Sequence, residues 1–461
     1  MNVMPVIACW IIYRLGFINW LIRIFGDKET RTAFYIAGMA MVFFIIVMLL
    51  FRVTIVMDYF FGTDQNRVLG DFTTVSANHY RIKVHPFYVL LWQTLYHLFC
   101  PLVNKTSLAI RVMVCLVSGL NVGIFSLFIS RITKSVLLNV IICSLMIFSF
   151  SQILHGSQIL ESFIFTQSSI LLLFLYFSFA FSGNDYNPPA LLTLSLFVTG
   201  NNIAYLCVFI IFYIILLYRL SESWLTACNR IFRFAFWYMI IFSILLLAQK
   251  FFYPPGAPPN IFSMIKDIFS EEGGYIVSHS VSYIRYAKSF FNVILFQHLP
   301  LGIGATFHHG WLWAVMLLAP VLGYGKIADK PLFVAIVASC MFLFVFHRFY
   351  GYYELPLYSP VIMCAYLSMF AFITQIIPKK FIIFLCCPLL ALMFYFNFIG
   401  LYTVHCISQY VFGRADIADY KKYAANIDLL KEHIKDYNGN SVFIYRVIPP
   451  PLKNTPPIRP Q

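Results

Sequence analysis

The chain is built mainly from apolar runs about twenty residues long that carry almost no charge. A helix needs about twenty apolar residues to cross the hydrocarbon core of a bilayer, so each run is a candidate transmembrane helix. About eleven candidates can be recognised by this criterion: 33–55, 109–130, 136–154, 163–182, 190–201, 203–218, 234–250, 311–325, 331–347, 357–377 and 381–403. The sequence therefore predicts an all-α polytopic membrane protein.

The composition excludes the soluble classes of protein. Charged residues make up 11% of the chain and apolar residues 61%, whereas soluble domains carry roughly 25% charged residues. Aromatic residues make up 19%, and aromatic side chains favour the membrane interface. We expect the lipid bilayer as a partner and no nucleic acid, because the net charge of +14 is explained by basic cytoplasmic loops.

Basic residues predict the orientation of the helices, because cytoplasmic loops are enriched in Lys and Arg. With the N-terminus inside, the short cytoplasmic loops hold nine of these residues: Arg131, Lys134, Arg219, Arg230, Arg233, Lys326, Lys330, Lys379 and Lys380. The short turns on the other side, 155–162, 200–202 and 348–356, hold only Arg348. This asymmetry requires that 86–103 does not cross fully, so we expect it to form a juxtamembrane or re-entrant helix.

The pattern predicts three parts of the chain. Residues 1–32 form a cytoplasmic amphipathic segment, and 33–403 form the transmembrane domain with outer loops at 58–108 and 251–310. Residues 404–461 change abruptly in composition, with an amphipathic helical stretch, a strand-like run and a Pro-rich end. We expect this tail to be a small extracytoplasmic α/β module.

The first outer loop contains the pattern of acidic, basic and histidine residues that best suits a catalytic site. Asp58 lies nearest the membrane, and the unit Asp64–Arg67 places an acid three residues before a base. His85 and Pro86 then open an aromatic apolar segment. The alternative is that these are ordinary polar loop residues, since a loop of this length normally carries several.

Two further outer turns hold charged residues beside apolar helices. Glu161 lies in the turn 155–162, where the helix macrodipole alone would also favour a carboxylate at the start of the next helix. The turn 348–356 combines Arg348, Tyr350 and Glu354. An interfacial aromatic belt explains the tyrosines of this turn but not its charged residues.

These motifs and their order resemble the GT-C glycosyltransferases, polytopic enzymes that include protein O-mannosyltransferases and aminoarabinose transferases of lipid A. The match lies in Asp64, Arg67, His85 and Pro86 of the first outer loop, and in the placement of the two later turns. Gln65 departs from the family pattern, which commonly has a second acid there, and this makes Asp58 a rival to Asp64.

The resemblance implies a GT-C-like catalytic domain over 33–403 that moves a sugar from a polyprenyl-phosphate donor to an acceptor hydroxyl. Asp64 or Asp58 would be the general base and Glu161 would orient the acceptor, which is a polysaccharide such as O antigen, or a lipid. Seven residues would bind the substrate and its phosphate: Arg67, His85, Arg285, Lys288, Arg348, Tyr350 and Glu354.

Arg285 and Lys288 belong to an amphipathic stretch of the long loop, which predicts a helix lying on the outer leaflet. The alternative for these two cations is snorkelling to lipid headgroups. The chain lacks a Gly-rich nucleotide loop, and His308-His309 has no matching ligand set for zinc. We expect no cofactor, with a divalent cation as the open alternative.

Two rival functions share this composition. A polymerase of polysaccharide repeat units would concentrate its activity in loop 251–309, and a lipid-linked sugar flippase would need charges within its spans, which the apolar runs lack. The usage of Phe, Ile, Tyr, Asn and Lys favours a bacterial protein. With the N-terminus inside, we expect it in the inner membrane, with its active site and C-terminus in the periplasm.

Overall fold

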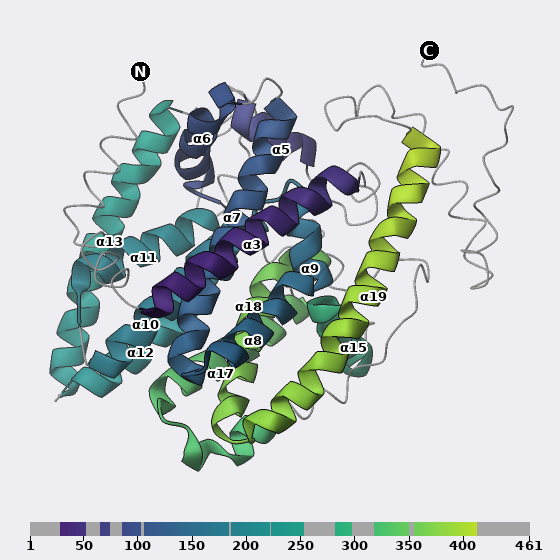
Figure 1. Cartoon of the computed structure of the whole chain (residues 1–461). Helices are drawn as coiled ribbons and strands as arrows, with labels where there is room; N and C mark the ends of the chain where they lie inside the picture. The colour runs from purple at the N-terminus through teal and green to yellow at the C-terminus, as the bar shows by residue number, and fades with distance from the viewer. Residues whose placement is uncertain are drawn as a thin grey trace, which may run out of the picture.

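The computed structural model describes most of the membrane domain (Figure 1). The described ranges are 28–51, 65–73, 85–102, 106–183, 186–221, 223–252, 282–296, 318–349 and 355–412. Every regular element in these ranges is a helix. Eight of the described helices are long and apolar enough to cross a membrane, and the count rises to nine if one bent pair is a span. The prediction of an all-α polytopic membrane protein is confirmed.

The candidate spans pack side by side in one bundle (Figure 1). They are α3 (Lys28–Leu50), α7 (Thr106–Thr133), α10 (Phe163–Gly183), α12 (Leu206–Leu220) with the preceding turn η4 (Ile203–Tyr205), α13 (Trp224–Phe252), α17 (Lys330–Phe349), α18 (Leu355–Ala371) with the turn η9 (Phe372–Gln375), and α19 (Lys379–Phe412). The bent pair consists of α8 (Val136–Phe148), followed by α9 (Phe150–Ile153) and the π-helix η3 (Leu154–Gln158).

Two of the predicted spans are absent from this set of described helices. α11 (Pro188–Asn201) covers the predicted span 190–201, but its 14 residues are too few to cross a bilayer. The side chain of Asn187 caps its start by accepting the Ala190 N–H (3.1 Å). Residues 311–317 of the predicted span 311–325 lie outside the described residues, and the described part, 318–325, is too short to be a candidate span by itself. The number of eleven spans therefore stays a prediction.

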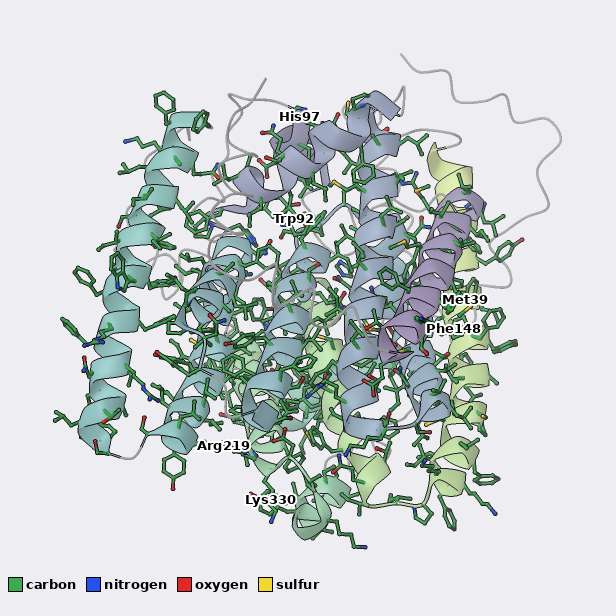
Figure 2. All side chains as sticks on the ribbon, turned by 60° about the vertical axis from the view of Figure 1, so that its left-hand side comes forward. Met39, Trp92, His97, Phe148, Arg219 and Lys330 are labelled. Atoms are coloured by element: carbon green, nitrogen blue, oxygen red, sulfur yellow. The ribbon has the colours of Figure 1, made fainter. Side chains whose placement is uncertain are left out.

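The predicted juxtamembrane segment forms a short helix, α6 (Tyr88–Phe99), of 12 residues. Figure 2 shows α6, marked by Trp92 and His97, at one end of the bundle. α5 (Gln65–Thr73) packs on it, because Gln93 of α6 donates to the Phe72 carbonyl (3.2 Å). A helix this short, placed at the end of the bundle, agrees with the prediction that 86–103 does not span.

α3 and α7 approach closely because small residues line their contact. An added Cβ at Gly119 would lie 2.1 Å from Cγ of Met41, and one at Gly123 would lie 2.8 Å from Cβ of Ala37. The spacing of Gly119 and Gly123 matches the small-xxx-small motif of transmembrane helices. Since lipid is as apolar as the helices, such close van der Waals contact supplies much of their attraction.

The bundle has two chemically distinct ends. At one end, Ser130 donates to the Glu29 carboxylate (3.1 Å) and Arg131 lies 3.4 Å from the Ser178 carbonyl. At the other end, the ring of Phe163, which begins α10, lies 6.2 Å from the ring of His85. We call these the Arg131 end and the His85 end.

The basic residues of the predicted cytoplasmic loops gather at the Arg131 end. Arg131, Lys134 and Arg219 line one cavity there. Figure 2 shows Arg219 and Lys330 at the opposite end of the bundle from Trp92 and His97. The described helices therefore separate the two groups of loops as the predicted topology requires.

A single asparagine stabilises the bend between α8 and α9, where the two axes differ by 63°. The Asn397 amide of α19 donates to the carbonyls of Phe148 and Leu295, each at 2.8 Å. Phe148 is the last residue of α8, and Leu295 is the last residue of α15 (Tyr283–Leu295). A helix end buried in a membrane protein needs such a donor, because no water is present to replace it.

The predicted domain boundaries fall partly outside the described residues. α3 begins at Lys28, so only the last residues of the predicted segment 1–32 are described. α19 continues to Phe412, beyond the predicted end of the last span at 403. The rest of the predicted α/β module, 413–461, lies outside the described residues.

We predict that Gly123→Leu destabilises the protein, because the larger side chain would push α3 away from α7. Overpacking of this kind costs about 1–3 kcal/mol. The measurement is the thermal unfolding midpoint of the purified protein in detergent. Gly38→Leu is the matched control, since an added Cβ at Gly38 meets no atom within 4 Å. An equal loss in both variants would contradict the close contact of α3 and α7.

Candidate functional site

His85 is a predicted site residue that the structure describes, and it is buried. Its Nδ1 contacts the carbonyl oxygen of Asn201 in a short hydrogen bond. Because a carbonyl only accepts, Nδ1 must carry the proton, and Nε2 is then an acceptor in the neutral ring. The Ser162 hydroxyl lies 3.5 Å from Nε2.

The chain around His85 is attached to the end of α11. The Phe87 N–H donates to the Gly200 carbonyl (3.0 Å), and the Trp92 indole N–H donates to Oδ1 of Asn201 (2.6 Å). Gly200 permits this approach, because an added Cβ would lie 2.6 Å from the Phe87 ring. α11 is thus too short to span but positions the His85 segment.

Glu161 lies in the extended stretch between η3 and α10 and is 1% exposed. Its Oε2 accepts the N–H of Ser162 (3.0 Å) at the start of α10. This contact agrees with the macrodipole explanation for an acid at this position. It also fixes the carboxylate beside Ser162, whose hydroxyl faces His85.

The end of α17 reaches the same region through a series of aromatic rings. His347 is fully buried, and its ring lies 4.4 Å from that of Tyr358 on α18. The Tyr358 ring is 4.6 Å from Phe163, which in turn contacts His85. The structure therefore brings His85, Glu161 and the His347-Arg348 pair together at the His85 end.

Arg348 is linked to α15 by its side chain. Its guanidinium carbon lies 5.0 Å from the ring centre of Tyr283 and 5.7 Å from that of Tyr286, within the range of a cation–π interaction. Arg348 is 7% exposed, so protein side chains rather than water surround most of it. The cation is consequently held against the helix that carries Arg285.

The predicted amphipathic helix is present as α15, but the middle of its apolar face packs within the protein and not on the outer leaflet as predicted. Tyr286 and Phe290 are fully buried. The Phe290 ring lies 5.1 Å from Phe344 of α17 and 5.6 Å from Tyr366 of α18. An amphipathic pattern shows that a face is buried and cannot distinguish protein from lipid as the partner, which explains the error.

Beneath the His85 end, amide side chains connect α7, α9 and α10. Gln167 donates to Oε1 of Gln152 and to the Pro360 carbonyl, both at 2.9 Å, and it accepts from Asn121 (2.9 Å). Gln152 lies on α9, next to the π-helix, and π-helical turns are frequent at functional sites. The motifs of the sequence did not predict this network, although amide side chains within long apolar runs were a usable signal.

Several predicted site residues lie outside the described part of the chain. They are Asp58, Asp64, Tyr350 and Glu354. Arg67 lies on α5, and Arg285 and Lys288 lie on α15, but their side chains are also outside it. α5 begins directly after Asp64, and its Phe72 ring is 6.1 Å from Phe165 near the start of α10. The helix that carries Arg67 is therefore a neighbour of the Glu161 turn.

No protein-family model, curated protein or solved structure matches this chain. Among the described residues, no three His, Cys, Asp or Glu side chains are placed to share a metal ion. A cavity of about 830 Å³ lies at the Arg131 end, away from the predicted catalytic residues. The support for a candidate site at the His85 end is therefore the arrangement of its own side chains.

We predict a coupling between Trp92 and Asn201. Asn201→Leu leaves the buried indole N–H without an acceptor, which costs about 1–3 kcal/mol. In a Trp92→Phe background the same substitution should cost much less, because the donor has been removed. Thermal unfolding followed by circular dichroism at 222 nm measures all four proteins. An equal cost in both backgrounds would contradict the hydrogen bond.

Proposed function

We propose that the protein is a membrane glycosyltransferase that moves a sugar from a polyprenyl-phosphate donor to an acceptor hydroxyl at the His85 end. One observation carries the proposal: His85, Glu161 and Arg348 come from three distant parts of the sequence and lie buried at one end of the bundle. This is the placement expected from the resemblance to the GT-C enzymes.

In the proposed reaction, the acceptor oxygen attacks the anomeric carbon of the sugar from the side opposite the phosphate. The new glycosidic bond forms, the bond from carbon to phosphate oxygen breaks, and the anomeric configuration inverts. The acceptor proton passes to Asp64 or Asp58. A carboxylate in this role contributes about 10²- to 10⁴-fold, and polyprenyl phosphate leaves.

The leaving phosphate gains negative charge, so a fixed cation nearby stabilises the transition state. Arg348 meets this requirement among the described residues, because it is mostly buried and held against Tyr283 and Tyr286. Arg67, Arg285 and Lys288 complete the proposed phosphate site. His85 positions the loop, and Glu161 orients the acceptor hydroxyls.

The proposal includes an orientation in a bacterial inner membrane. The Arg131 end would face the cytoplasm, because basic residues are retained there. The His85 end and the C-terminus would then face the periplasm, where the acceptor is a polysaccharide such as O antigen, or a lipid. The polyprenyl tail of the donor would enter from the surrounding bilayer.

A polymerase of polysaccharide repeat units is the second candidate. The observation that favours it is the contact of Arg348 with Tyr283 and Tyr286 of α15, because α15 belongs to the long loop that would hold a polymerase site. In that case the reacting groups would lie around α15, and the Asp64 loop would only support them.

We predict that Asp64→Asn or Asp58→Asn lowers glycosyl transfer by about 10²- to 10⁴-fold, because each substitution removes a candidate general base. The assay incubates purified protein with polyprenyl-phosphate sugars and acceptor glycans and measures free polyprenyl phosphate. Unchanged release in both variants would exclude the proposed catalytic centre. Release of polyprenyl diphosphate from linked repeat units would favour the polymerase instead.

We also predict that Arg348→Gln lowers the same transfer at least tenfold, through the loss of a buried cation beside the leaving phosphate. Arg233→Gln is the matched control, because it removes an equal charge from an exposed position on α13. A comparable loss of activity in the two variants would indicate a general effect of charge on folding or insertion. Thermal unfolding midpoints of both variants separate this outcome from catalysis.

A further inference from the structure

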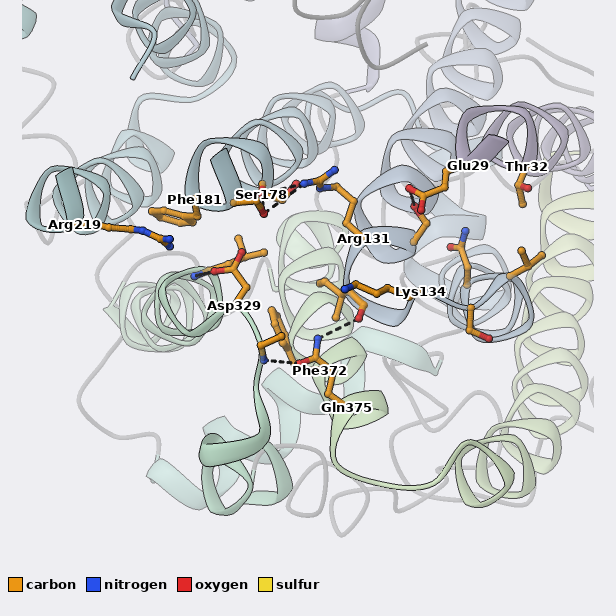
Figure 3. Close-up of a pocket in the computed structure, with 18 residues that line it drawn as sticks. Glu29, Thr32, Arg131, Lys134, Ser178, Phe181, Arg219, Asp329, Phe372 and Gln375 are labelled. Atoms are coloured by element: carbon orange, nitrogen blue, oxygen red, sulfur yellow. Dashed lines mark hydrogen bonds between the residues drawn. The ribbon is translucent and has the colours of Figure 1, made fainter. Parts of the chain in front are cut away.

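The Arg131 end contains a cavity of about 830 Å³ between α3, α7, α10, α12 and α17. Figure 3 shows charged and hydroxyl side chains around it. The main ones are Glu29, Arg131, Lys134, Ser178, Arg219 and Asp329. The volume is in the range of small-molecule sites, and the proposed glycosyl transfer at the His85 end does not use it.

Three cations from two chain segments converge on this cavity. Arg131 lies in the last turn of α7, Lys134 follows that helix, and Arg219 lies in the last turn of α12. Within the described part of the chain, the Lys134 amine and the Arg219 guanidinium make no hydrogen bond or ion pair. Both groups are therefore available to a ligand.

The two carboxylates of the cavity are engaged with their own surroundings. Glu29 accepts from the Ser130 hydroxyl (3.1 Å). Asp329 accepts the Leu332 N–H (3.2 Å) at the start of α17. Burial raises the pKa of Asp329, while the Leu332 N–H, Arg219 and Arg131 oppose that shift. Among the described residues, Lys134 and Arg219 make no ion pair with either acid, and the lining of the cavity holds three cations and two carboxylates.

The geometry of Arg131 is fixed before any ligand binds. Its guanidinium carbon lies 3.6 Å from the centre of the Phe179 ring. One of its terminal nitrogens lies 3.4 Å from both the Ser178 carbonyl and the Ser182 hydroxyl. A guanidinium held in this way brings a positive charge of fixed position to the cavity, and the planar guanidinium group matches the geometry of phosphate oxygens.

Lys134 has a backbone conformation that lysine rarely adopts. Its φ is 47°, and it is the one non-glycine residue with a positive φ among the described residues. Helices usually end with glycine or asparagine in this conformation, because a Cβ atom adds strain. Figure 3 shows the Lys134 side chain extending into the cavity. A strained lysine at this position suggests that its side chain is needed there.

We propose that this cavity binds a phosphate ester, with the phosphate on Arg131, Lys134 and Arg219. Glu29 and Asp329 would accept hydrogen bonds from hydroxyl or amino groups on the rest of the ligand. The ligand is either the headgroup of an anionic phospholipid or a soluble phosphate ester, because both combine a phosphate with hydroxyl groups. In this proposal, the strained backbone of Lys134 is kept because it places the lysine amine at the phosphate.

The test measures binding to the purified full-length protein, by thermal unfolding at increasing ligand concentration. The probes are glycerol 3-phosphate, dihexanoyl phosphatidylglycerol and, as the phosphate-free comparison, dihexanoylglycerol. We expect stabilisation by at least one phosphate probe and none by dihexanoylglycerol. Stabilisation by phosphatidylglycerol alone identifies a lipid headgroup, and stabilisation by glycerol 3-phosphate identifies a soluble ester.

Lys134→Gly is the decisive variant, because it removes the amine and relieves the strained φ together. We expect its unfolding midpoint without ligand to equal or exceed that of the unchanged protein. Its affinity for the effective probe should fall about tenfold or more, as expected for the loss of one charge-assisted contact. Arg219→Gln should weaken binding similarly, and Lys326→Gln, which lies outside the cavity, should not.

Two outcomes would overturn the proposal. The first is that none of the probes stabilises the protein, and the second is that Lys134→Gly binds the probe as tightly as the unchanged protein does. The assay needs no glycosyl transfer, so failure here leaves the proposed activity at the His85 end untouched. Loss of that activity would likewise leave the cavity proposal standing.

Discussion

The absence of water in the hydrocarbon core of the bilayer governs this structure. Every backbone N–H and carbonyl group there needs a partner within the protein. Long helices meet this requirement along most of the chain. Where a helix breaks, a side chain must replace the lost bonds, as Asn397 does for the carbonyls of Phe148 and Leu295.

The same constraint explains where polar side chains are placed. The bend between α8 and α9 leads into a π-helix, and the amides of Gln152 and Gln167 join each other at this level. The turn that follows carries Glu161 into contact with the start of α10. Irregular backbone in a membrane protein is tolerated where protein or a polar cavity surrounds it. Here it positions the candidate site at the His85 end.

The two ends of the bundle use charge differently. At the His85 end, few charges are present among the described residues, and Glu161 and Arg348 are buried. At the Arg131 end, Lys134 and Arg219 are exposed beside a polar cavity. Buried charges are costly and need fixed partners, whereas exposed basic residues also serve membrane orientation. The two proposed sites therefore differ in how tightly their charged groups are held.

Much of the fold could be predicted from local patterns. Apolar runs predict the long helices, because the length needed to cross a bilayer depends only on the rise per residue. The charge asymmetry of the loops predicts a juxtamembrane or re-entrant helix at 86–103, and the 12 residues of α6 agree with this prediction. α15 was predicted as a helix from its amphipathic pattern, yet its apolar face packs on α17 and α18. Periodicity identifies a buried face but not the surface that covers it.

The sequence by itself determined the membrane class and the position of most helices. Only the tertiary structure decided that His85 contacts the carbonyl of Asn201 and that Arg348 lies over Tyr283 and Tyr286. It also decided that Arg131, Lys134 and Arg219 share one cavity. Membrane helices are specified by the composition of each segment alone, whereas contacts between distant segments depend on how the helices pack.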